Sequence, residues 1–376
     1  MNAKYFLLGA ALAAGLLGVR ALAQDAPATQ PGPAVVNIHM KQALAEDVFD
    51  ELAKQGGIKF STNGGNLWEQ DAMQSGIDID LTNRSFWSAT LECCDLWNLS
   101  IQPNFNSGAG RRVMLQQLGP RRRQGKLPIC ESQGFVVQAV SFNRQQTVNY
   151  TSPDNSQNFC SVQLMVYVDP SIHLQSLNQT VKADEAVDDA GHSMIPNTNN
   201  GIFYGGGQAA SLIYNCNVPL KYPDNAGKKI TDLKCTLQMR GSDKAETMTV
   251  DKPLTADEST KSFGALSITF QSLKKTGNGN YELKLSVSRD DPNGGGNDWN
   301  LLQNGQLTDE KGRLFSYAGG GGGGNDGNGN SSYTVNYNSF NGGETAHGEP
   351  VKWAIELPAD AHTIKVPLEF KDLALP

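Results

Sequence analysis

The chain has 376 residues and a formal net charge of −7 at pH 7, with 40 glycines, 17 prolines and 6 cysteines. A mildly acidic chain lacks the basic surface that general nucleic-acid binding requires, which excludes that class of partner. The cysteines are too few for a fold held mainly by disulfides, so packed apolar cores must supply most of the stability.

The N-terminus predicts a secretory signal peptide over residues 1–23. Lys4 supplies the positive charge, residues 5–19 form an apolar run, and residues 21–23 form a small-residue cleavage site. Nothing after it approaches the ~18 consecutive apolar residues of a membrane helix. We therefore expect an exported protein, secreted or periplasmic, with no transmembrane segment. The Pro-rich residues 24–34 predict a linker.

An internal repeat dominates the part of the chain that follows. Residues 37–60 and 78–101 align without a gap at an offset of 41 positions. Each copy alternates apolar and polar residues, then carries an apolar stripe at helical spacing, and then alternates again. Gly57 and Asn98 follow the two stripes, where a helix end favours a residue in the left-handed conformation. The pattern predicts a small α+β domain of two strand–helix–strand units, closed by a strand at 112–118.

Residues 35–118 resemble, through this repeat, the short N-terminal (STN) domain shared by secretins and TonB-dependent receptors. In that family the domain is a periplasmic docking module without catalytic residues, so the resemblance implies a docking role. The rest of the chain departs from the family, and outer-membrane transport is therefore not implied. The whole layout also resembles uncharacterised secreted bacterial proteins that join such a domain to sandwich-like repeats.

Basic residues gather where this domain ends. The segment 119–128 carries three consecutive arginines and Lys126, and Arg111 and Arg112 lie just before it. Such a cluster suits contact with an anionic envelope polymer or a lipid headgroup. It lacks the interleaved aromatic residues of single-strand nucleic-acid binders, and a solvated basic linker explains it more simply.

The remaining sequence predicts strands and turns in two similar modules, which cover 129–250 and 263–376 and are joined by a linker at 251–262. In one pair of matching segments, 188–194 and 309–315, each copy contains an Asp-x-x-Gly turn. Two modules of this length with many short strands suit tandem immunoglobulin-like β-sandwiches. The predicted fold class is therefore multi-domain, with an α+β domain followed by all-β modules. The matching segments are 134–144 with 264–275, 160–170 with 281–292, 188–194 with 309–315, and 217–239 with 352–373.

Two glycine-rich stretches contain the sequence Gly-Gly-Gly-Asn-Asp, which is similar to a calcium-binding repeat of Gly- and Asp-rich turns. The first stretch makes Asp290, Asp291 and Asp298 the candidate calcium ligands, and no other cofactor is indicated. The second stretch lies in the glycine-rich run 318–332. Because the copies are only two and lie apart, a flexible loop is the simpler interpretation of both.

The cysteines divide into packing and disulfide candidates. Cys93 and Cys94 occupy positions that are apolar in the first copy of the repeat, so we expect core packing rather than redox or metal chemistry. Cys216 and Cys235 lie symmetrically about a turn at 223–229. We expect a hairpin at that turn and a disulfide across it.

The sequence contains no catalytic motif, since its 5 histidines are scattered and no nucleophile elbow, P-loop or zinc motif occurs. We therefore expect a non-enzymatic binding or scaffold protein that acts on an envelope protein or polymer through exposed strand edges or loops. One alternative is a carbohydrate- or ligand-binding module, with or without calcium, that uses the glycine-rich loops and Trp299. The other alternative is a hydrolase of unknown type.

Overall fold

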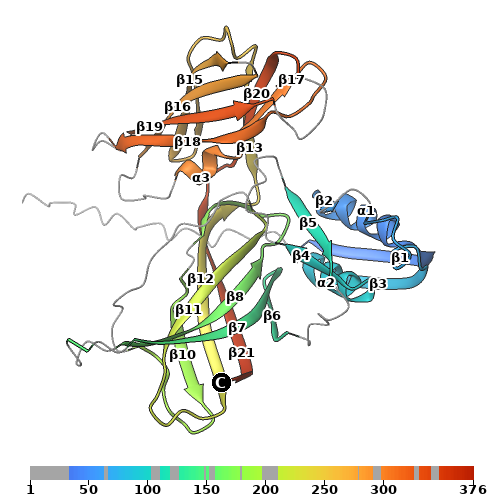
Figure 1. Cartoon of the computed structure of the whole chain (residues 1–376), viewed down its shortest axis with the longest axis vertical. Coiled ribbons are helices and arrows are strands. Elements are labelled where there is room, and N and C mark those ends of the chain that lie inside the picture. The colour runs from blue at the N-terminus through green and yellow to red at the C-terminus, as the bar shows by residue number, and fades with distance from the viewer. Residues whose placement is uncertain are drawn as a thin grey trace, which may run out of the picture. The chain divides into compact units, whose positions relative to one another are not determined.

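The computed structural model (Figure 1) shows a mostly β chain with several sheets. Within the described residues, no helix is long and apolar enough to cross a membrane. The expected signal peptide 1–23 and most of the basic segment 119–128 lie outside the described residues. The structure describes residues 34–62, 67–102, 111–118, 127–147, 150–151, 157–177, 180–196, 211–277, 279–290, 298–325, 330–339 and 347–376.

The N-terminal part contains five strands and two helices in the predicted order. The strands of one repeat copy do not pair with each other: β1 pairs antiparallel with β3, while β5 lies between β2 and β4. Gly57 and Asn98 both adopt a positive φ, of 59° and 54°, which confirms their predicted role at the helix ends. The elements are β1 (Val35–Ala43), α1 (Ala45–Gly56), β2 (Lys59–Thr62), β3 (Ile77–Ser85), α2 (Phe86–Leu96), β4 (Leu99–Gln102) and β5 (Arg112–Gln117).

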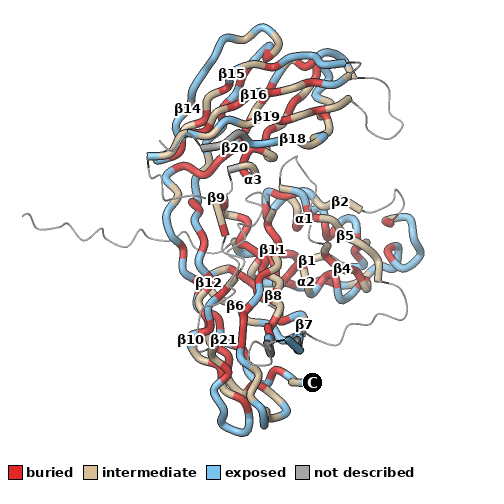
Figure 2. The backbone as a smooth tube through the Cα atoms, turned by 60° about the vertical axis from the view of Figure 1, so that its left-hand side comes forward, coloured by how far each residue is buried: buried red, intermediate tan, exposed pale blue. Residues whose placement is uncertain are grey.

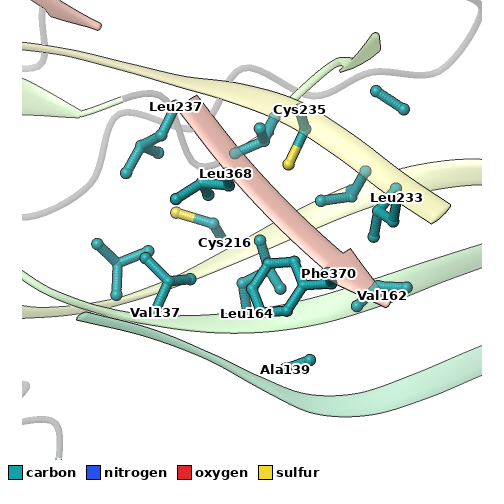
Figure 3. Close-up of a cluster of buried hydrophobic side chains, with 14 of the residues drawn as sticks. Val137, Ala139, Val162, Leu164, Cys216, Leu233, Cys235, Leu237, Leu368 and Phe370 are labelled. Carbon is teal, nitrogen blue, oxygen red and sulfur yellow. The ribbon is translucent and has the colours of Figure 1, made fainter. Parts of the chain in front are cut away.

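A first β core forms between two sheets. One sheet has the order β11-β8-β7-β6, and the other has the order β10-β12-β21, with β9 also paired to β12. Figure 3 shows side chains of both sheets meeting in one apolar layer, with Leu368 and Phe370 of β21 among them. The strands are β6 (Ile129–Ser132), β7 (Phe135–Thr147), β8 (Gln157–Tyr167), β9 (His173–Leu177), β10 (Ala183–Asp188), β11 (Ile213–Lys221), β12 (Lys229–Ser242) and β21 (His362–Ala374).

A second β core forms between a three-stranded sheet, β13-β20-β17, and a five-stranded sheet, β14-β15-β16-β19-β18. Figure 2 shows the buried positions alternating with exposed ones along these strands, as expected for a sheet with one face on a core. The elements are β13 (Ala245–Asp251), β14 (Ser259–Phe263), β15 (Leu266–Gly277), β16 (Asn280–Arg289), α3 (Asp298–Leu302), β17 (Gln306–Asp309), β18 (Ser316–Asn325), β19 (Asn330–Asn338) and β20 (Pro350–Pro358).

The last strand of the chain belongs to the first β core. We expected 263–376 to form one module, but β21 pairs with β12 along its length, and the two strands lie side by side in Figure 1. The register passes without a shift into the pair β13–β20. Gly241 lies opposite His362 and Ala245 lies opposite Pro358, while the N–H of Ala359 bonds the carbonyl of Lys244 between them. The second β core is thus inserted between two adjacent strands of the first.

The Asp-x-x-Gly turns confirm that the two β cores share a pattern. Asp188 accepts hydrogen bonds from the backbone N–H groups of His192 and Gly227, and Asp309 accepts them in the same way from Arg313 and Gly348. Each glycine follows its aspartate by 39 positions. The strand after the glycine is β12 in the first copy and β20 in the second, so β12 corresponds to β20. The correspondence drawn above between 217–239 and 352–373 is therefore displaced by one strand.

The N-terminal part packs against the first β core. Trp87 of α2 is fully buried, its Nε1–H donates to the carbonyl of Val168 at 2.6 Å, and its ring centre lies 5.2 Å from that of Tyr167 on β8. Cys93 and Cys94 are buried in the same apolar cluster, which confirms the expectation of core packing. This face of α2 is therefore covered by β8 and its neighbours.

Candidate binding site

An open sheet edge is formed by β18, the last strand of the five-stranded sheet. The strand pairs with β19 alone among the named strands. Residues 319–322 are glycines, so this stretch of the edge presents backbone N–H and C=O groups without side chains. Natural sheets protect such edges with charged residues, prolines or very short strands. The segment Tyr317–Gly324 contains no charged residue and no proline.

Aromatic rings occupy the space that side chains at some positions of the glycine run would need. A Cβ on Gly320 would collide with the Trp299 ring and with the carbonyl oxygen of Thr334. A Cβ on Gly322 would lie 2.9 Å from the Tyr333 ring, while one on Gly321 would meet nothing. Alternate glycines thus face the rings and the other side of the sheet. Much of the stretch 318–332 that we expected to be a flexible loop is therefore an ordered hairpin.

Three half-buried aromatic residues line one face of this edge. The Trp299 ring is stacked on Tyr333 with ring centres 6.1 Å apart, and it lies at the same distance from Tyr317. All three rings pack at the margin of the second β core. They form an apolar border beside the bare backbone of β18.

The structure describes only part of the predicted calcium site. Asp290 is exposed after the end of β16, Asp291 lies outside the described residues, and Asp298 begins α3. Among the residues that the structure describes, no group of three or more His, Cys, Asp or Glu side chains is arranged to hold a metal ion. Calcium binding at these aspartates stays a prediction.

The predicted disulfide partners lie in opposite sheets. Cys216 is on β11, which pairs with β8, while Cys235 is on β12, so the hairpin that we expected between β11 and β12 does not form. Both side chains point into the first β core (Figure 3). The structure contains no disulfide among the six cysteines, all of which it describes. The reason is topological, because the turn at 223–229 carries the chain from one sheet to the other.

Sequence reasoning missed the open edge because six successive glycines are typical of a loop. The signal that could have found it lies in the flanks, where Ser316 and Tyr317 precede the run and the alternating segment 331–337 follows it. Trp299 was singled out in the sequence as a carbohydrate contact, and the structure places it against the strand. Comparison with known proteins gives no match: no family model, no curated protein and no solved structure is similar to the chain.

Proposed function

We propose that the protein is a non-enzymatic binding protein of the periplasm or the medium, and that β18 binds an extended segment of a partner protein as an added strand. The observation that carries this proposal is the glycine backbone of β18, which has no charged residue and no proline, beside the aromatic border of Trp299, Tyr317 and Tyr333. Strand addition uses main-chain hydrogen bonds for affinity and side-chain contacts for specificity. The backbone of β18 offers the main-chain groups, and the three aromatic rings offer the side-chain contacts.

The glycines favour an added strand on steric grounds. No side chain at 319–322 interferes with a neighbouring strand, and Gly321 is open to solvent on its face of the sheet. A partner strand gains main-chain hydrogen bonds along this edge.

The aromatic border favours a partner with apolar side chains over a second copy of the chain. The β18 strand of a second copy would place glycines against Trp299 and Tyr333 and leave the rings half exposed. A segment that alternates apolar and polar residues would cover the rings with its apolar side. We expect such a segment in an envelope protein.

N-methylated peptides test strand addition directly. Peptides are selected from a random display library against the full chain, and each is then N-methylated at its odd or at its even residues. Successive N–H groups of a strand point to opposite edges, so one methylated series should lose binding and the other should keep it. Equal binding of both series would refute strand addition. Binding of insoluble polysaccharide that is lost on Trp299→Ala, with no peptide bound, would favour the carbohydrate alternative.

A further inference from the structure

A cavity of about 540 Å³ opens among residues that precede β5 or belong to β2, β9 and β20. Its volume lies in the range of small-molecule sites, about 300–1,000 Å³. Apolar side chains form part of the wall, including Ile58, Leu174 and Leu314. The charged and titratable side chains of the lining are Lys59, Arg111, Arg112, His173 and Glu356.

The side chain of Arg111 is the most informative feature of this cavity. Its Nε and Nη2 atoms are buried, and neither has a hydrogen-bond partner among the described residues. These two nitrogens carry parallel N–H bonds on one edge of the guanidinium, the arrangement that forms a two-bond fork with an oxyanion. Buried donors are almost always paired in folded proteins, so this pair calls for an acceptor that the described residues do not supply.

The nearby carboxylate does not satisfy the fork. Glu356 lies 3.3 Å from Nδ1 of His173, and it acts on Arg111 by charge without a hydrogen bond to Nε or Nη2. Burial lowers the pKa of His173, and the charge of Arg111 lowers it further, which favours the neutral imidazole. Lys59 and Arg112 are exposed, where solvent screens their charges.

The charge balance favours a ligand with a single negative charge. Glu356 is exposed like Lys59 and Arg112, so Arg111 is the one shielded charge among these lining residues; Asp169, which is buried outside the lining, acts on it by charge. A dianion such as phosphate would be repelled by Glu356 more strongly than a planar carboxylate would be. The apolar wall suits the uncharged body of such a ligand.

We propose that this cavity binds a carboxylate, which accepts two parallel hydrogen bonds from Nε–H and Nη2–H of Arg111. The site is separate from β18, and a test of carboxylate binding is independent of a test of strand addition. The shared chemistry of its ligands is the carboxylate, whether it ends a peptide or belongs to a uronic acid.

Calorimetric titration of the full chain tests the site with matched pairs of probes. N-acetyl-leucine and glucuronate carry the carboxylate, while N-acetyl-leucinamide and glucose lack it. We expect binding of at least one carboxylate and at least about tenfold weaker binding of its uncharged counterpart. Binding of N-acetyl-leucine alone identifies a peptide terminus, and binding of glucuronate alone identifies a uronic acid. Failure of both carboxylates at tens of millimolar, or equal binding of the uncharged probes, would overturn the proposal.

Three variants separate the fork from general charge. Arg111→Gln and Arg111→Lys should both weaken carboxylate binding at least about tenfold, because lysine keeps the charge but cannot form the fork. Arg84→Gln, which changes an exposed arginine of β3 outside the lining, should bind like the unaltered protein. Carboxylate binding by Arg111→Lys at full strength would contradict the fork.

The stability of the ligand-free protein gives a second readout. Arg111→Met removes two buried donors that have no partner, so its melting temperature should equal or exceed that of the unaltered protein. A clear fall in melting temperature would show that Arg111 supports the fold instead of a ligand, and it would overturn the assignment.

Discussion

Two leucines eleven residues apart should destabilise different cores. Leu357 lies near the end of β20 in the second β core and is 1% exposed, while Leu368 of β21 is 2% exposed in the first β core, opposite Cys235. Replacing a buried leucine by alanine costs about 2–5 kcal/mol, through lost burial and the cavity that remains. At 2 kcal/mol, the equilibrium between folded and unfolded forms of the affected core shifts about 30-fold.

Hydrogen exchange with peptide resolution distinguishes the two cores. Leu368→Ala should speed exchange about 30-fold or more in β8 and leave β16 nearly unchanged, and Leu357→Ala should do the reverse. The two strands are suitable reporters because each lies within the sheet of its own core. Faster exchange in β16 but not in β8 on Leu368→Ala would refute the placement of β21.

Three further predictions concern buried polar groups. Burial raises the pKa of Asp188, but hydrogen bonds from Gly227 and His192 outweigh this effect and lower the pKa from 3.8 to about 2. The ionised carboxylate therefore stabilises the fold above about pH 4, and this stabilisation is lost as the pH falls towards 2. Urea midpoints measured across this range should fall less steeply in Asp188→Asn, and parallel curves would contradict the assignment. Trp87→Phe should lower the free energy of unfolding by about 1–3 kcal/mol in urea titration because it leaves the carbonyl of Val168 unpaired, and no change would show that this contact is absent in solution. Burial, with a smaller effect of Glu92, raises the pKa of Cys93 to about 12. Iodoacetamide should therefore label Cys93 and Cys94 only after unfolding, as peptide mass spectrometry would show. Rapid labelling of the folded protein would disprove their burial.

Local pattern was sufficient for the N-terminal elements. The repeat at an offset of 41 placed the helices of both copies, because an apolar stripe and a left-handed residue at its end are encoded within a dozen residues. The same holds for the Asp-x-x-Gly turns, where the aspartate and the glycine are close neighbours in the sequence. Pairing between strands was harder, since β1 joins β3 rather than β2.

The position of β21 could not be read from local pattern. Its alternation of buried Ile364, Val366 and Leu368 with exposed residues suits any strand that covers a core, so it did not distinguish the two cores. The choice depends on pairing with β12, more than a hundred residues earlier in the chain. The same non-local topology separates Cys216 from Cys235 into opposite sheets, although their spacing about a turn suggested a hairpin.

Both candidate sites depend on contacts that sequence reasoning missed. In the glycine strand, Trp299 packs so closely against Gly320 that a side chain at that position would collide with its ring. Arg111 belonged to a basic cluster that suited a solvated linker, and it is set apart only by the burial of its Nε and Nη2 atoms. That burial arises where residues from separate strands meet, and no spacing in the sequence records it.

Hydrogen exchange of β18 in the presence of a display-selected peptide tests the proposed function most directly. Half of the backbone N–H groups of an edge strand face solvent and exchange quickly, and an added strand would protect them. We predict that the peptide slows exchange in residues 316–325, with little change in β14 at the opposite edge of the same sheet. Protection at β14 or in the N-terminal part, with none in β18, would contradict the account.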